Sequence, residues 1–103
     1  MNDPRIGKTL LFISLLFSAV STLSANEVSA SELSDAQQLF KKKCSLCHAI
    51  DKKKLGPAVK TMSQEAETLR QAITKGRNSM PAFEGKLSSG EIAALVDYFL
   101  SQQ

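Results

Sequence analysis

Apolar residues recur at three- and four-residue intervals in three separate segments of the chain from Ser31 onward. This spacing is typical of amphipathic helices that bury one face. No window in the same part of the chain alternates apolar and polar residues in the way that predicts a strand. The pattern therefore predicts an all-α domain with three main helices.

The first predicted helix begins at Ser34 and runs into Cys44. Ser34 and Gln37 have the residue types and the spacing of a capping box. The helix has one apolar face, which consists of Ala36, Leu39 and Phe40.

The second predicted helix ends at Gly76, because glycine readily adopts the left-handed backbone that terminates a helix. Ser63 or Thr61 is its predicted N-terminal cap. Its apolar side consists of Ala66, Leu69, Ala72 and Ile73.

The third predicted helix opens with a capping box formed by Ser88 and Glu91 and continues to the C-terminus. Its face is strongly apolar, which favours a buried position. The residues of this face are Ile92, Leu95, Val96 and Phe99.

Two long loops separate the predicted helices, over residues 49–61 and 77–87. Small domains have small cores and commonly need a disulfide, a metal, a cofactor or a partner chain for stability. With two cysteines in 103 residues, this chain can form at most one internal disulfide. We therefore expect the loops to pack around a cofactor.

The first thirty residues have the features of a secretory signal peptide. Arg5 and Lys8 precede an apolar run, and small residues favour cleavage after Ala25 or Ala30. A membrane anchor is the alternative interpretation, but the apolar stretch over residues 10–23 is shorter than the about 20 residues that a spanning helix needs. The sequence thus predicts export.

The predicted signal peptide at residues 1–30 leaves a single functional domain at residues 31–103. The chain has 13 basic and 10 acidic residues, which give a net charge of +3. Nucleic-acid binding usually requires a concentrated basic face, so this small net charge does not indicate it. We expect no nucleic-acid partner and no stable membrane insertion once the signal peptide is removed.

The two cysteines lie in the sequence Cys44-Ser45-Leu46-Cys47-His48, which is the pattern of covalent haem c attachment. On one helical turn, two thiols three positions apart can reach both vinyl groups at one porphyrin edge, and the adjacent imidazole can bind the iron. The alternatives are a redox-active cysteine pair, which would want a βαβ context, a zinc site, which would need a fourth ligand, and a plain disulfide. Export and the lack of further ligands favour one haem c, attached through Cys44 and Cys47.

The second axial ligand of such a haem comes from few residues, because His48 is the only histidine. The candidates are Met80, Met62 and a lysine. Met80 follows a helix stop and precedes Pro81, which stiffens the loop that would present the thioether. Met62 lies beside a helix start, where core packing is the expected role. We expect His48 and Met80 to bind the iron, with Asn78 either donating to the thioether or forming a turn.

With these residues placed, the chain resembles the class I cytochromes c, in particular the small monohaem cytochromes of the bacterial periplasm. The resemblance covers essentially all of residues 31–103 and rests on the haem motif, Gly56-Pro57 and Met80-Pro81 in this order. It implies a helix that ends at the haem motif and crosses a C-terminal helix, with loops wrapped around one covalently attached haem. It also implies a periplasmic location.

The resemblance assigns roles to further residues. It implies that the Pro57 carbonyl accepts a hydrogen bond from the His48 ring, which would fix the ring and strengthen it as a ligand. Phe40 and Tyr98 correspond to aromatic residues that pack where the terminal helices cross. Ala36 corresponds to the small residue that lets these helices approach closely.

An iron with both axial positions filled can exchange electrons but has no open site for a substrate. We therefore expect a one-electron carrier between respiratory or photosynthetic redox partners rather than an enzyme. One alternative is a haem subunit of an exported oxidoreductase complex, for example one that oxidises sulfur compounds. Another is a gas or peroxide enzyme from which Met80 dissociates readily.

Two runs of lysines flank the haem motif: Lys41, Lys42 and Lys43 precede it, and Lys52, Lys53 and Lys54 follow it. Any single lysine is expected to belong to a solvated surface that keeps the protein soluble. Together, the two runs lie near the predicted haem edge, where their charge would attract an acidic redox partner. We expect the chain to be a monomer that meets such partners briefly.

Overall fold

The computed structural model describes residues 28–103, which form three α-helices and one short 3-10 helix. These elements are α1 (Ala30–Lys43), η1 (Val59–Thr61), α2 (Ala66–Lys75) and α3 (Ser89–Ser101). No strand occurs in residues 28–103, so the predicted all-α class is confirmed. Except for residues 28–30, the predicted signal peptide lies outside the described residues.

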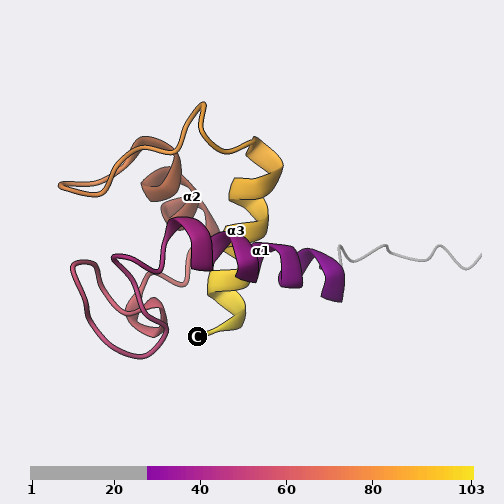
Figure 1. Cartoon of the computed structure of the whole chain (residues 1–103), viewed down its shortest axis with the longest axis horizontal. Coiled ribbons are helices and arrows are strands. Elements are labelled where there is room, and N and C mark those ends of the chain that lie inside the picture. Colours follow the sequence, from indigo (N-terminus) through magenta and orange to yellow (C-terminus); the bar gives the residue numbers. More distant parts are fainter. Residues whose placement is uncertain (1–27) are drawn as a thin grey trace, which may run out of the picture.

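Helices α1 and α3 pack across each other, and α2 packs against α3 (Figure 1). At the crossing of α1 and α3, Ala36 is 1% exposed. The Phe40 ring lies 5.7 Å from the Tyr98 ring and 5.8 Å from the Phe99 ring, measured between centroids. The small residue and the aromatic pair that the resemblance implied for this crossing are therefore both present.

Helix α1 begins at Ala30, so the prediction that it begins at Ser34 is wrong. Its N-cap is Ser29, whose hydroxyl accepts a hydrogen bond from the Glu32 N–H while the Ser29 N–H donates to the Glu32 carboxylate. Ser34 and Gln37 have the same spacing, but the earlier box places a carboxylate at the positive end of the helix dipole. It also adds a helical turn, which is why it prevails.

The predicted cap of α2 is also wrong, because the N-cap is Glu65. The Ser63 hydroxyl accepts a hydrogen bond from the Glu65 N–H at 3.1 Å, and the Thr61 hydroxyl donates to the Ala58 carbonyl at 2.9 Å. Both hydroxyls therefore stabilise the turns before the helix instead of its first turn.

The C-terminal end of α2 follows the prediction, with Gly76 at a φ of 73°. On its predicted apolar side, Leu69 and Ile73 are buried, Ala72 is half-buried, and Ala66 is exposed. Ala66 is the first residue of α2, and its side chain is exposed instead of packing against the core.

Helix α3 matches the prediction in its start and its buried face, but it ends at Ser101 and does not continue to Gln103. Its N-cap is Ser88, which forms a complete capping box with Glu91. The predicted apolar residues Ile92, Leu95, Val96 and Phe99 are all buried. None of the helices formed by residues 28–103 has the length and apolar character needed to cross a membrane.

The long segments that connect the helices lie at one end of the molecule. In Figure 1, the segment between α1 and α2 and the segment between α2 and α3 both extend on the side where α1 ends. The last residues of α1 and its C-cap Cys44 therefore lie at the same end of the molecule as the two connecting segments.

Candidate haem-attachment site

The predicted haem motif forms a tight turn directly after α1. The Cys44 N–H still donates to the Phe40 carbonyl at 2.8 Å, and the N–H groups of Cys47 and His48 donate to the Cys44 carbonyl at 3.1 and 2.9 Å. Cys44 and His48 are buried, whereas Cys47 is half-buried. The structure therefore brings the three predicted motif residues together on a single turn.

The two cysteines form no disulfide with each other and lie in different surroundings. Burial, with a smaller contribution from the neighbouring Cys47, raises the pKa of the Cys44 thiol to about 11. Before a haem is attached, Cys44 is therefore protonated at neutral pH, and its side chain packs in the core as a small apolar residue.

The His48 ring is oriented by the backbone of the opposite segment. Its Nδ1 lies 2.9 Å from the Pro57 carbonyl oxygen, and because that oxygen can only accept, Nδ1 carries the proton. The remaining nitrogen, Nε2, keeps its lone pair for a metal. The hydrogen bond that the resemblance implied is present.

Gly56 lies directly against the His48 ring. A Cβ at this position would be 2.1 Å from His48 Cε1 and 2.6 Å from His48 Nδ1, far inside contact distance. Only glycine leaves room for the imidazole here. The sequence predicts Gly56 only as part of a Gly-Pro loop motif, and its position directly before Pro57 was the signal that could have revealed this role.

Residues 54–60 run back along residues 45–50, and four hydrogen bonds join the two segments besides the bond between His48 and Pro57. The backbone bonds run from Gly56 N–H to the Cys47 carbonyl, from Val59 N–H to Ala49 and from Lys60 N–H to Ile50. The fourth bond joins the Lys54 ammonium to the Ser45 carbonyl, with 2.5 Å between Nζ and O. This last contact was not predicted, and it makes Lys54 a support of the haem motif.

Met80 lies on the loop between α2 and α3, half-buried and packed against the core. The Arg77 N–H donates to the Met80 carbonyl and the Met80 N–H donates to the Arg77 carbonyl, at 3.1 and 2.9 Å. Between them, Asn78 is exposed with a φ of 55°, a conformation that asparagine tolerates better than most residues. This geometry supports the turn-forming role of Asn78.

Met62 also packs against the core and is half-buried, in agreement with the core-packing role predicted for it. It is the C-cap of η1, and its N–H donates to the Val59 carbonyl at 3.1 Å. Burial alone does not separate the two methionines, because both are partly covered. They differ in setting, since Met62 ends a hydrogen-bonded 3-10 turn and Met80 belongs to a loop.

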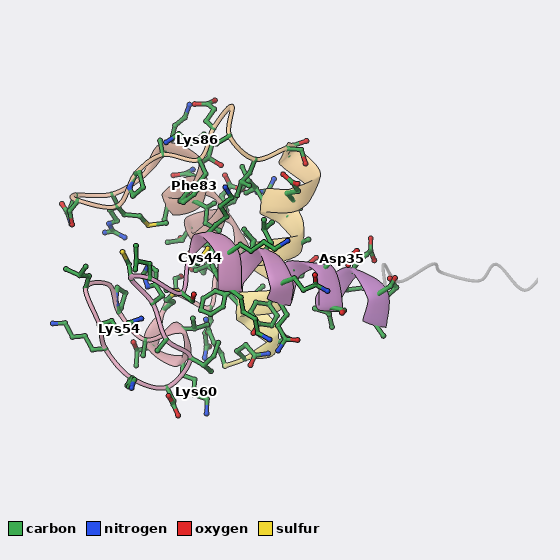
Figure 2. The ribbon with its side chains drawn as sticks, in the orientation of Figure 1. Asp35, Cys44, Lys54, Lys60, Phe83 and Lys86 are labelled. Atoms are coloured by element: carbon green, nitrogen blue, oxygen red, sulfur yellow. The ribbon has the colours of Figure 1, made fainter. Side chains whose placement is uncertain are left out.

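The residues of the site come from one helix end and two loops. In the view of Figure 2, Cys44 lies between the loop that carries Lys54 and the loop that carries Phe83 and Lys86. Asp35 lies toward the other end of α1.

These groups fit a covalently attached haem. The turn supplies two thiols and an imidazole whose Nε2 is free to bind iron, and the neighbouring glycine leaves space for the ring. The two segments between the helices also carry apolar side chains that pack against the core, are only partly buried and can cover a porphyrin; they are Ile50, Met62, Met80 and Phe83.

Comparison with known proteins gives the same assignment. Residues 31–99 match the protein family described as cytochrome c oxidase, cbb3-type, subunit III. Cytochrome c6 of Microcystis aeruginosa is 34% identical over 77 residues, which cover 66% of this chain and 94% of that protein. Cytochrome c6 of a Synechococcus strain is 30% identical over 105 aligned positions, covering 92% of this chain and 93% of the relative. Cytochrome c6 of Gracilaria tenuistipitata is 28% identical, covering 90% and 94%.

The relatives are electron carriers and not enzymes, and they do not favour the alternative of a subunit in an exported oxidoreductase complex. The family carries haem c covalently, and the paired cysteines Cys44 and Cys47 have the spacing that this attachment requires. The chain therefore belongs to the class I cytochromes c, as a small monohaem electron carrier with one covalently bound haem c.

Proposed function

We propose that this cytochrome carries single electrons in the periplasm through a haem iron bound by His48 and Met80. The haem, when bound, takes up and releases one electron at a time. The observation that carries the proposal is the hydrogen bond between His48 Nδ1 and the Pro57 carbonyl, because it directs Nε2 away from the protein backbone as a ligand.

Met80 is the proposed second axial ligand because it lies outside the helices, in a loop whose backbone is held by hydrogen bonds. The paired backbone hydrogen bonds of Arg77 and Met80 form a short turn, and Pro81 restricts the chain directly after the thioether. A thioether favours ferrous over ferric iron, so this ligand pair supports a positive midpoint potential. With both positions filled, no site remains for a substrate.

The periplasmic location rests on the features of the first thirty residues. A short basic segment, an uncharged apolar run and small residues before Ala25 and Ala30 are the three parts of a secretory signal.

The proposed redox partner presents an acidic surface to the end of the molecule that carries the haem motif. All the lysines of both runs are exposed, and they belong to the last turn of α1 and to the loop that follows the motif. Asp35, by contrast, lies toward the other end of α1 (Figure 2). Asp51 lies in the same loop, but the six lysines leave the haem end with an excess of positive charge, which turns this end toward a negative partner during encounter.

Substitution of the two methionines tests the ligand assignment. In the haem-loaded protein, we expect Met80→Ala to lower the midpoint potential, to abolish the charge-transfer absorption of the sulfur-to-iron bond and to open the iron to added ligands. The matched control is Met62→Ala, which removes a similar side chain from the core and should leave the haem spectrum close to that of the unsubstituted protein. The reverse result would assign the ligand to Met62.

A further inference from the structure

The loop that carries Met80 is closed at its base by hydrogen bonds to the end of α2. The Phe83 N–H donates to the Ile73 carbonyl at 3.0 Å, and the Glu84 N–H donates to the Thr74 carbonyl at 3.1 Å. The chain therefore leaves α2 at Gly76, passes through Met80 and returns to α2 within a few residues. These two bonds hold the two ends of the loop together, with Met80 between them.

An ion pair joins the same two segments, the end of α2 and the end of the loop. The Lys75 ammonium lies 2.7 Å from the Glu84 carboxylate, between Nζ and Oε2. Lys75 is the last residue of α2, and Glu84 is the residue whose backbone already binds Thr74. The side chains are 66% and 60% exposed, so the ion pair lies at the surface and joins the two ends of the loop there.

The loop above the base is folded tightly on itself. A Cβ at Gly76 would be 2.5 Å from the Met80 carbonyl oxygen and 2.8 Å from the Ala82 nitrogen. The backbone of the loop thus contacts Gly76 directly and has little room to move while its ends are held. If the ends of the loop separate, the backbone around Met80 gains room to move.

We propose that Lys75 and Glu84 are positioning residues that keep the Met80 loop closed and so slow the departure of the thioether from the iron. This inference rests on the proposed function, in which Met80 is the axial ligand. The two residues do not touch the haem ligands themselves; they act by shutting the base of the loop. Because the pair is exposed, its contribution is modest and is weakened by salt.

The chain offers a matched control on the same helix. Arg70 and Glu67 form an ion pair three residues apart within α2, with 3.4 Å between Arg70 Nε and Glu67 Oε2 and side chains 55% and 65% exposed. This pair is as exposed as the pair of Lys75 and Glu84 but lies within one helix, away from the base of the loop. Its removal changes surface charge without releasing the loop.

The test measures how fast imidazole replaces the sixth ligand of the ferric, haem-loaded protein, at a pH where imidazole is neutral. We expect Lys75→Gln and Glu84→Gln each to accelerate replacement about two- to fivefold, the factor that an exposed ion pair supplies. The double variant should be no faster than either single variant, because both remove one interaction. Arg70→Gln should match the unsubstituted protein, and concentrated salt should bring the unsubstituted rate up to that of the variants.

Three results would overturn the inference. One is a rate for Lys75→Gln and Glu84→Gln equal to that of Arg70→Gln. Another is a double variant whose acceleration equals the product of the two single effects, which would mean that the residues act separately. The third is an unchanged haem spectrum in Met80→Ala, which would reject Met80 as the ligand and, with it, the role of Lys75 and Glu84. If Met80→Ala changes the spectrum but Lys75→Gln and Glu84→Gln do not change the rate, only the role of Lys75 and Glu84 is rejected.

Discussion

Single residues set the position of His48 more than the helices do. The ring is held between the Pro57 carbonyl, which fixes its tautomer, and Gly56, which has no side chain to displace it. A hydrogen bond of this kind can be lost by movements of less than an ångström, because its strength falls steeply with distance and angle. The glycine therefore matters as much as the acceptor.

Replacement of Gly56 tests this view. In Gly56→Ala, the new Cβ would overlap the His48 ring, so the ring or the returning segment has to shift. We expect the haem-loaded variant to lose about 1–3 kcal/mol of unfolding free energy, as overpacked sites do. Denaturant titration followed by the haem absorption would measure this loss.

The control for this substitution is Gly90→Ala, in the first turn of α3. A Cβ there would have Ser88 Oγ as its nearest atom, at 3.9 Å, and alanine is favoured over glycine in helices by about 1 kcal/mol. Gly90→Ala should therefore be neutral or stabilising. A Gly56→Ala protein as stable as the Gly90→Ala protein would contradict the close contact with the ring.

At the scale of elements, the N-terminus of α1 is defined by the capping box of Ser29 and Glu32. Hydrogen bonds from the backbone and the hydroxyl of Ser29 hold the pKa of the Glu32 carboxyl below its ordinary value of 4.5. The ionised carboxylate is the form that accepts these bonds, so they stabilise α1 above that pH and are lost as the pH falls through the lowered pKa of the folded state. Residue 29 is thus part of the folded domain.

This boundary leads to a prediction about the mature protein. Cleavage after Ala30 would remove the Ser29 cap and place a positive amino group at the positive end of the helix dipole. Cleavage after Ala25 would retain the complete capping box. We therefore expect the mature chain to begin at Asn26, which mass spectrometry of the protein from the periplasmic fraction would establish. A mature chain that begins at Ser31 would contradict the expectation that cleavage preserves the Ser29 capping box.

At the scale of the whole molecule, the distribution of charge matters more than the net charge of +3. The haem motif ends α1 and is followed by a basic loop, while the first turn of α1 carries Glu32. The second lysine run is not uniform, however. Lys54 donates to the Ser45 carbonyl, whereas the side chains of Lys52 and Lys53 are available to a partner.

The salt dependence of electron transfer tests the proposed steering. We expect the rate with an acidic partner to fall steeply as salt rises, because exposed charges are screened over about 8 Å at physiological ionic strength. Replacement of Lys52 and Lys53 by glutamine should slow association and flatten this dependence, with the midpoint potential nearly unchanged. Stopped-flow rates at low and high salt would measure both effects.

Two controls accompany this experiment. Arg70→Gln removes one positive charge from α2 and should have the smaller effect. Lys54→Gln is analysed separately, because it also removes the bond to Ser45 and is expected to lower stability. A rate that does not respond to salt would remove the steering proposal and favour docking through apolar contacts near Ala82 and Phe83.

The sequence by itself determined the features that depend on neighbouring residues. The helical periodicity of α3, its capping box at Ser88 and the glycine stop of α2 all appear in the structure as predicted. The haem motif is equally local, because one turn of chain contains both thiols and the imidazole. The resemblance to a known family supplied the Pro57 acceptor, which no local rule would have identified.

Local rules failed where two candidates competed. Ser29 with Glu32 and Ser34 with Gln37 both satisfy the spacing of a capping box, and only the longer helix with its charged partner shows which one forms. The start of α2 failed for a similar reason, since the Ser63 hydroxyl serves a turn and leaves the cap to Glu65.

The tertiary structure alone decided the contacts between segments that are separated along the chain. The crowding of Gly56 against His48, the bond from Lys54 to Ser45 and the pairing of Lys75 with Glu84 depend on how the loops return. Periodicity and capping describe the surroundings of a residue within about one helical turn, whereas these contacts depend on the path of the chain over eight or nine residues. The sequence therefore predicted the groups that hold the haem, and the fold determined which residues hold those groups in place.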